Sequence, residues 1–162
     1  MKKIQYIWIT ILVILLDQIS KLLIRNYLDV GKIIEVTKKI FWLHHVENTG
    51  AAFSISLGND VVNRIIFICV SIIAIVLLIY LNSKSKSKIE KIAFALILGG
   101  AIGNLIDRII FGKVTDFLSC DFPDIFMERW PVFNIADSSI VIAITIMIVH
   151  SVFFTRKTVE ET

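Results

Sequence analysis

Four long apolar runs dominate this sequence, over residues 4–24, 61–81, 89–110 and 135–154. Each is close to the roughly 20 residues that a helix needs to cross a bilayer. Hydrophobic residues make up 56% of the chain and charged residues only 19%, which is too little charge to cover a soluble globule. We therefore predict an all-α membrane protein with four transmembrane helices, forming a single domain over residues 1–162. The first run has no small-x-small cleavage site after it, so we expect an uncleaved helix.

The basic residues predict how the chain crosses the membrane. Eight of them lie at the two termini and between the second and third runs: Lys2, Lys3, Lys84, Lys86, Lys88, Lys91, Arg156 and Lys157. Six are spread over the much longer connectors 25–60 and 111–134: Arg25, Lys32, Lys38, Lys39, Lys113 and Arg129. By the positive-inside rule, both termini face the cytoplasm and these two connectors lie outside it. The net charge of +3 is too small to suggest a nucleic-acid partner.

The connector 25–60 predicts a small β region between the first two helices. Residues 32–37 and 39–48 are rich in β-branched and aromatic side chains and are separated at Lys38-Lys39, which favours a strand pair. The rings of Phe41 and Trp42 suit the headgroup level of a bilayer. This region is either a folded loop lying on the membrane or a platform that grips a ligand.

Ionisable residues inside the apolar runs are candidates for function, because they are costly to insert into a membrane. Asp17 and Lys21 lie four residues apart, so they share a helix face and can pair. One interpretation is a functional pair. The other is a neutralising pair in which Lys21 extends outward to the membrane surface.

The segment GGAIGNLIDR at 99–108 holds a second polar group. Its glycines form a GxxxG step that permits close helix packing. Asn104, Asp107 and Arg108 follow at helical spacing. Asp107 and Arg108 could form a structural ion pair, whereas the five donors of Arg108 suit it to supporting a neighbouring carboxylate or backbone group.

Asp116 and Asp137 are the candidates for catalysis. One follows the third run and the other begins the fourth, so both belong near the outer surface at one depth. Asn134 and Asp137 also resemble a helix capping box, which is a structural alternative for Asp137. Two close carboxylates share a proton: one can then activate water, while the other donates to the carbonyl oxygen under attack.

Other chemistries have weaker support in the sequence. His44, His45 and Glu47 lack the spacing of a zinc motif, Ser138 and Ser139 have no neighbouring histidine, and we expect no metal or cofactor. Asn48 and Gly50 begin a small-residue segment that either binds an extended peptide or forms a tight turn. Cys120 is interpreted as incidental. Asp121 and Asp124 are interpreted as exposed loop residues in the acidic 118–130 connector.

Five segments together resemble the lipoprotein signal peptidases (signal peptidase II), which are bacterial membrane aspartyl proteases. They are DQISK at 17–21, NTGAAFS at 48–54, GGAIGNLIDRI at 99–109, VTDF at 114–117 and FNIADSSI at 133–140. The resemblance implies a catalytic dyad of Asp116 and Asp137, and an active site lined or supported by Asp17, Lys21, Asn48, Gly50, Asn104, Asp107, Arg108, Asn134 and Ala136.

The resemblance also implies a substrate and an inhibitor. The substrate is a prolipoprotein with a diacylglyceryl cysteine, cut on the N-terminal side of that cysteine at the outer face of the bacterial cytoplasmic membrane. The inhibitor is globomycin, and membrane lipid is a further expected partner. The alternative function is a small proton-coupled transporter or channel that uses Asp17, Asp107 and Asp137 as a relay, which calls for acids at several membrane depths or for repeated halves.

Overall fold

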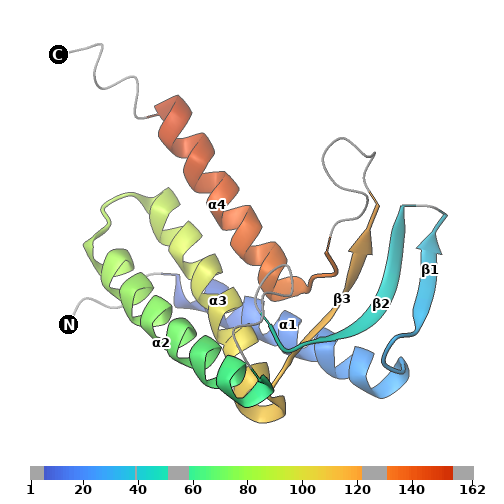
Figure 1. Ribbon diagram of the computed structural model, residues 1–162. Helices are drawn as coiled ribbons and strands as arrows, with labels where there is room; N and C mark the ends of the chain where they lie inside the picture. Colours follow the sequence, from blue (N-terminus) through green and yellow to red (C-terminus); the bar gives the residue numbers. More distant parts are fainter. Residues whose placement is uncertain (1–5, 39, 51–58, 122–130, 155–162) are drawn as a thin grey trace.

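The computed structural model describes residues 6–38, 40–50, 59–121 and 131–154 (Figure 1). It contains four long helices: α1 (Ile7–Tyr27), α2 (Asp60–Lys84), α3 (Lys88–Phe111) and α4 (Ile135–Phe154). All four are long and apolar enough to cross a membrane, which confirms the predicted helical architecture. Helices α1 and α2 continue three residues beyond the predicted apolar runs, because helical hydrogen bonding carries on into the first polar residues of the connectors.

A three-stranded antiparallel sheet lies beside one end of the helices. Strands β1 (Ile33–Thr37) and β2 (Phe41–Asn48) form the predicted pair, and β3 (Val114–Cys120) adds to β2, giving the order β1-β2-β3. Residues 114–120 fall in the predicted connector 111–134, so β3 was not expected from the sequence. Its pairing with β2 sets Asp116 opposite Val46.

Helix α3 is the centre of the bundle, with α1, α2 and α4 packed around it. Glycines allow this close packing. A Cβ atom added to Gly99 would lie 2.6 Å from Cβ of Val13 in α1, and one added to Gly100 would lie 2.5 Å from the backbone oxygen of Ala136 in α4. The predicted packing role of the glycine segment is thereby confirmed, with Gly100 extending it to α4.

The outer surface of the helices is apolar and the interior near the sheet is polar. In the span of α2, only 6% of residues in the most apolar window are buried inside the molecule, so most of its side chains are available to lipid. Among the described residues, the largest fully buried side chains are all polar: Asp17, Lys21, Asn63, Asp107 and Asn134. Such an arrangement is typical of a membrane protein with a polar site enclosed between its helices.

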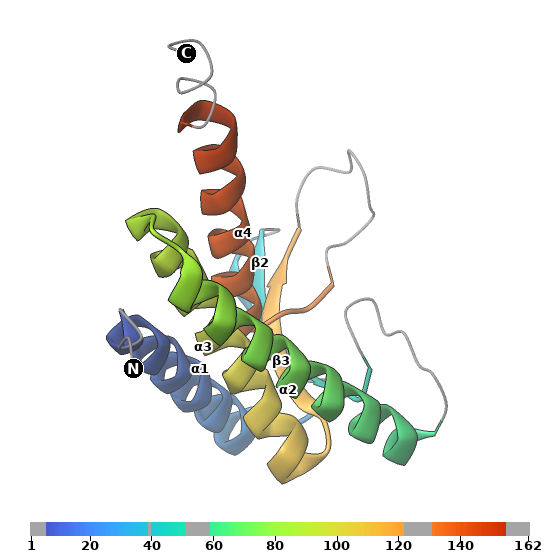
Figure 2. The same cartoon turned by 90° about the vertical axis from the view of Figure 1, so that its left-hand side faces the viewer.

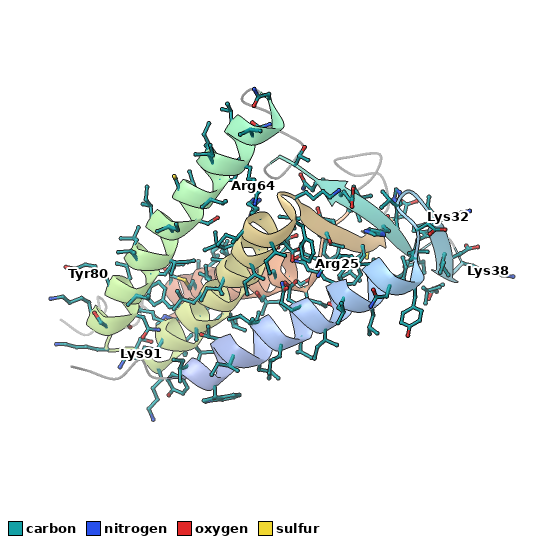
Figure 3. The ribbon with its side chains drawn as sticks, turned by 90° about the horizontal axis from the view of Figure 1, so that it is seen from below. Arg25, Lys32, Lys38, Arg64, Tyr80 and Lys91 are labelled. Atoms are coloured by element: carbon teal, nitrogen blue, oxygen red, sulfur yellow. The ribbon has the colours of Figure 1, made fainter. Side chains whose placement is uncertain are left out.

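The elements that carry the polar residues converge at the sheet end of the bundle. Helices α1 and α3 run toward the sheet, whereas α2 and α4 run away from it (Figures 1 and 2). Figure 3 shows Lys32 and Lys38 at the hairpin end and Tyr80 and Lys91 at the opposite end. The start of α1, the α2–α3 connection and the end of α4 therefore lie toward the other end of the bundle (Figures 1 and 3).

Candidate active site

Asp116 and Asp137 are linked by two asparagines. The side-chain nitrogen of Asn134 donates to Oδ1 of Asp116 at 2.6 Å, and its backbone nitrogen donates to Oδ2 of Asp137 at 3.2 Å. Asn104 donates to Oδ1 of Asp137 at 2.8 Å. Asn134 thus bonds both the strand carboxylate and the helix carboxylate, so the two predicted acids share one polar cluster.

The predicted capping box is also present. The backbone nitrogen of Asp137 donates to Oδ1 of Asn134 at 2.9 Å, and Asp137 accepts the return bond from the Asn134 backbone. Capping therefore fixes the start of α4 while leaving Asp137 half-buried beside the other acid. Asp137 can therefore cap α4 and belong to the polar cluster at the same time.

Asp116 is buried, with an exposed fraction of only 3%. Burial and the neighbouring Asp137 carboxylate raise the pKa of Asp116 to about 7. Hydrogen bonds from Asn48 and Asn134 and the positive charge of Lys21 lower the pKa, but they only partly offset the first two effects. Near neutral pH this carboxyl group can therefore exist in either protonation state, as general acid–base chemistry requires.

Lys21 lies fully buried behind the two acids. Its ammonium contacts Oδ2 of Asp17 at 2.9 Å, Oδ2 of Asp107 at 3.1 Å and Oδ1 of Asn104 at 2.8 Å. The Asp17–Lys21 pair is as predicted, but the outward extension of Lys21 is wrong because all three of its donors are used inside the protein. By holding the Asn104 oxygen, Lys21 leaves the Asn104 nitrogen to face Asp137.

The suggested Asp107–Arg108 ion pair is also wrong. Asp107 is fully buried against α1, where its charge is balanced by Lys21 and by Arg25, whose Nη1 is 3.4 Å from Oδ1. Arg108 points elsewhere, with Nη2 3.4 Å from the Gly50 backbone oxygen. Adjacent helical residues diverge by about 100° around the axis, which separates these two side chains.

Asp17 links α1 to the start of α4. Its Oδ1 accepts a hydrogen bond of 2.9 Å from the backbone nitrogen of Ala136, which is fully buried. A carboxylate is favourable at a helix N-terminus, where backbone N–H groups lack helical partners. Asp17 therefore caps α4 from another helix and helps to place Asp137.

Asn48 joins the end of β2 to the site. Its nitrogen donates to Oδ2 of Asp116 at 3.0 Å, and its Oδ1 accepts from the backbone nitrogen of Gly50 at 2.9 Å. The tight-turn interpretation of this segment is supported, and the amide is directed at Asp116. Residues 51–54 of the same motif lie outside the described residues.

Three residues of this cluster, Gln18, Arg25 and Thr115, were not identified from the sequence. Gln18 donates to Asp107 Oδ1 at 3.3 Å and to the Gly103 carbonyl at 3.0 Å, and Arg25 donates to Thr115 Oγ1 at 2.9 Å. Arg25 continues the four-residue spacing of Asp17 and Lys21. That spacing is the signal that could have placed it on the same helix face.

The remaining sequence candidates lie away from these contacts. His45 is buried with its Nδ1 atom 2.6 Å from the Leu28 carbonyl at the end of α1, which is a structural contact. Asp121 is half-buried and not exposed as predicted, because its backbone nitrogen bonds to Ile40 next to the sheet. Cys120 is a free thiol at the end of β3, and Asp124 lies outside the described residues. Within the described ranges, no three His, Cys, Asp or Glu side chains form a group that could hold a metal ion.

Comparison with known proteins identifies the family. Residues 9–153 match the family model described as signal peptidase (SPase) II. The chain belongs to the signal peptidase II family. It is therefore a multi-pass membrane peptidase of a bacterial family.

Signal peptidase II relatives match over nearly their whole length. The lipoprotein signal peptidase of Halothermothrix orenii is 43% identical over 143 residues, covering 88% of this chain and 91% of the relative. That of Borrelia hermsii is 40% identical, covering 92% and 90%, and that of Francisella tularensis subsp. novicida is 43% identical, covering 96% of each.

The fold is similar to that of solved structures. A bacterial membrane enzyme determined by the in meso method at 2.3 Å superposes with a TM-score of 0.81, at 32% identity, and covers 92% of this chain and 88% of that chain. A second one at 1.9 Å gives a TM-score of 0.79 at 31% identity, covering 91% and 92%. The four helices and the sheet therefore belong to a fold seen in solved membrane enzymes.

Proposed function

We propose that this protein is an aspartic endopeptidase that removes the signal peptide from prolipoproteins. In this proposal it hydrolyses the peptide bond on the N-terminal side of a cysteine that carries diacylglycerol. The observation that carries the proposal is the meeting of Asp116 and Asp137 across Asn134, in a chain that belongs to the signal peptidase II family. The whole chain acts as one membrane domain.

The two carboxyl groups divide the chemistry between them. With one shared proton, the ionised carboxylate removes a proton from water while the protonated one donates to the carbonyl oxygen of the scissile bond. The hydroxide attacks the carbonyl carbon and gives a tetrahedral intermediate. Its C–N bond then breaks as the leaving amine takes a proton. The proton on the dyad belongs to the pair, so either residue can carry it during the cycle.

The location of the acids supports a lipid-modified substrate. Asp116 follows α3 closely and Asp137 lies in the first turn of α4, so both are at one end of membrane-capable helices. Acyl chains can remain in the bilayer there while the peptide bond reaches the acids. We infer that both termini are cytoplasmic and that this end faces the outside, following the positive-inside rule.

The transporter alternative receives less support from the same geometry. A relay requires acids at successive depths across the membrane. Asp17 and Asp107 contact Lys21, which reaches Asn104 beside Asp137, so these acids form one cluster at the sheet end. Their convergence favours hydrolysis at a single site.

Separate replacement of the two acids tests the proposal. Asp116→Asn and Asp137→Asn keep the shape of each side chain but remove its ionisation. Each variant should lower cleavage of a diacylglyceryl prolipoprotein by at least about 1,000-fold while remaining monodisperse in detergent. Asp121→Asn, beyond the end of β3, is the matched control and should cleave at the wild-type rate.

The assay follows the mobility of the prolipoprotein on a gel, with globomycin as the expected inhibitor. Wild-type activity in either dyad variant would overturn the assignment of catalysis to the pair. Absence of cleavage by the wild-type protein, in an assay where another signal peptidase II is active, would overturn the proposed substrate.

A further inference from the structure

Thr115 precedes Asp116 in β3 and is held by two bonds from the helices. Its backbone nitrogen donates to Oδ2 of Asp107 at 3.1 Å, and its Oγ1 accepts from Nη1 of Arg25 at 2.9 Å. Successive strand residues point to opposite faces of a sheet, so Thr115 faces α1 and α3 while Asp116 faces the other way. Fixing Thr115 therefore fixes the strand from the face opposite the carboxylate.

Arg25 is itself held in place. It lies in the last turn of α1, its side chain is only 19% exposed, and its guanidinium carbon is 4.2 Å from the centre of the Phe111 ring. The same Nη1 atom is 3.4 Å from Oδ1 of Asp107. A planar guanidinium stacked on a ring and bonded at its edge keeps a defined orientation. Figure 3 shows Arg25 between α1 and the elements that carry Phe111 and Thr115.

The charges around Arg25 balance. Asp17 and Asp107 contribute two negative charges, and Lys21 and Arg25 contribute two positive ones. Removal of Arg25 would leave Asp107 with one of its two cations and Thr115 Oγ1 without its donor. Both losses act on the residue that precedes Asp116.

We propose that Arg25 is a positioning residue for Asp116 and acts through Thr115. This inference rests on the proposed function, because it assigns Arg25 to the placement of a dyad residue. Arg25 does not need to touch the substrate, since its contacts are with Thr115, Asp107 and Phe111. Its loss should therefore reduce turnover more than substrate binding.

A double-mutant cycle tests the coupling. Arg25→Met keeps the apolar length of the side chain and removes its donors, and Thr115→Val removes the hydroxyl with little change in shape. Each single variant should lower kcat by about tenfold with KM within about twofold, which is the scale of one lost hydrogen bond to a charged group. The double variant should be no slower than the slower single variant, because both remove the same contact.

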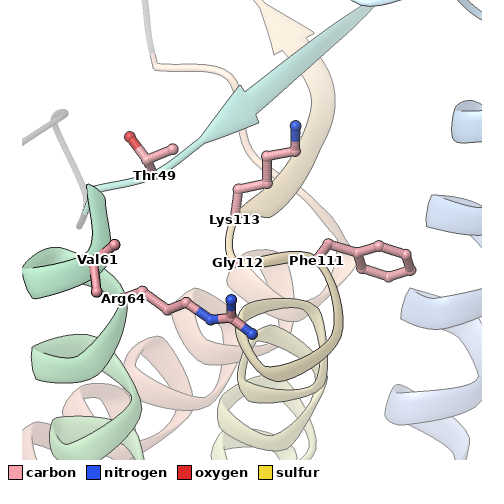
Figure 4. A pocket seen from close by; sticks show the side chains of 6 residues that line it. All are labelled: Thr49, Val61, Arg64, Phe111, Gly112 and Lys113. Atoms are coloured by element: carbon pink, nitrogen blue, oxygen red, sulfur yellow. The ribbon is translucent and has the colours of Figure 1, made fainter. Parts of the chain in front are cut away.

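Arg64→Met is the matched control. Arg64 lies at the outer end of α2 beside a pocket of about 220 Å³, and its Nη2 donates to the Ile109 carbonyl at 2.6 Å (Figure 4). That bond holds Arg64 at the C-terminal end of α3 and, among the residues that the structure describes, away from β3 and the acids. This variant should keep the wild-type kcat.

Hydrogen exchange gives a second measurement that does not depend on cleavage. Peptides covering residues 113–118 should exchange at least about threefold faster in Arg25→Met than in the wild-type protein, while peptides from α2 remain unchanged. The result that supports the proposal is faster exchange together with coupled losses in kcat.

Three results would overturn the role of Arg25. They are a wild-type kcat in Arg25→Met when Asp116→Asn is inactive, losses that multiply in the double variant, and unchanged exchange in β3. Equal cleavage by wild type and Asp116→Asn would instead overturn the proposed dyad. In that case the hydrogen-exchange measurement still tests whether Arg25 holds β3 through Thr115.

Discussion

At the scale of single residues, the site is built from buried polar groups whose partners, side chain or backbone, come mostly from other elements. Lys21 is fully buried, yet its ammonium has three oxygen partners. A buried charge is tolerable when it is paired and hydrogen-bonded in this way. Asp116 differs, because its hydrogen-bond donors are two neutral amides and it forms no ion pair among the described residues. Burial and the neighbouring Asp137 carboxylate therefore raise the pKa of Asp116.

The raised pKa of Asp116 predicts how stability depends on pH. Because its folded-state pKa is about 7 against an ordinary 3.8, the folded protein holds this proton more tightly than the unfolded chain. The resulting stability is complete below about pH 4 and is lost as pH rises through 7, by at most about 4 kcal/mol. The unfolding midpoint in detergent should therefore fall from pH 5 to pH 8.

Asp116→Asn should remove most of that fall, because the amide does not titrate. Asp29→Asn, which alters an exposed carboxylate before the sheet, should retain the wild-type slope. Thermal unfolding followed by intrinsic fluorescence measures both. An equal slope in wild type and Asp116→Asn would contradict the assigned titration.

At the scale of elements, small residues in α3 set the position of the helices that carry the acids. Gly100 packs against the first turns of α4, which hold Ala136 and Asp137. Asn104, one turn later in α3, donates to Asp137. The close approach at Gly100 and the hydrogen bond at Asn104 therefore depend on the same helix spacing.

Gly100→Ala should separate α3 from α4. The added methyl group would lie 2.5 Å from the Ala136 carbonyl oxygen and 2.8 Å from Ser139 Oγ, so backbone must move. We expect a loss of about 1–3 kcal/mol in stability and a marked loss of cleavage activity. Unfolding midpoints and turnover of prolipoprotein measure these effects.

Gly31→Ala is the control for this substitution. No atom lies within 4 Å of a Cβ added at Gly31, so the substitution lowers stability only because a side chain is strained at a φ of 81°. It should lose some stability but keep its cleavage activity. Full activity and an unchanged midpoint in Gly100→Ala would show that the two helices do not require this contact.

At the scale of the whole molecule, the candidate acids and the lysine-rich α2–α3 connection lie at opposite ends of the helix bundle. The hairpin with Lys32 lies at the end that carries the acids, and the α2–α3 connection with Lys86 lies at the other. The apolar helix surfaces between them are as long as a bilayer is thick. The polar cluster with Asp116 and Asp137 therefore lies at one end of four helices that are long enough to span a membrane.

Cysteine labelling tests the orientation. In a background with Cys69 and Cys120 replaced by serine, Lys32→Cys should react with a membrane-impermeant maleimide added to intact spheroplasts. Lys86→Cys should react only after the membrane is permeabilised. The reverse pattern would place the acids on the cytoplasmic side and contradict the proposed topology.

The sequence by itself determined the features that depend on one element at a time. Hydropathy located four spans, enrichment in β-branched and aromatic residues located the β1–β2 pair, and four-residue spacing paired Asp17 with Lys21. Chain order alone placed Asp116 and Asp137 at one end of the spans, since one follows a helix and the other begins the next.

Only the tertiary structure decided which residues meet across elements. It added β3 to the sheet, turned Lys21 inward to Asp107, set Asp17 on the start of α4 and joined Arg25 to Thr115. The physical reason is that such contacts depend on the rotation of each helix about its axis and on the distance between axes. Glycines in α3 bring α1 and α4 close to it, and no local periodicity along the chain records which side chains then meet.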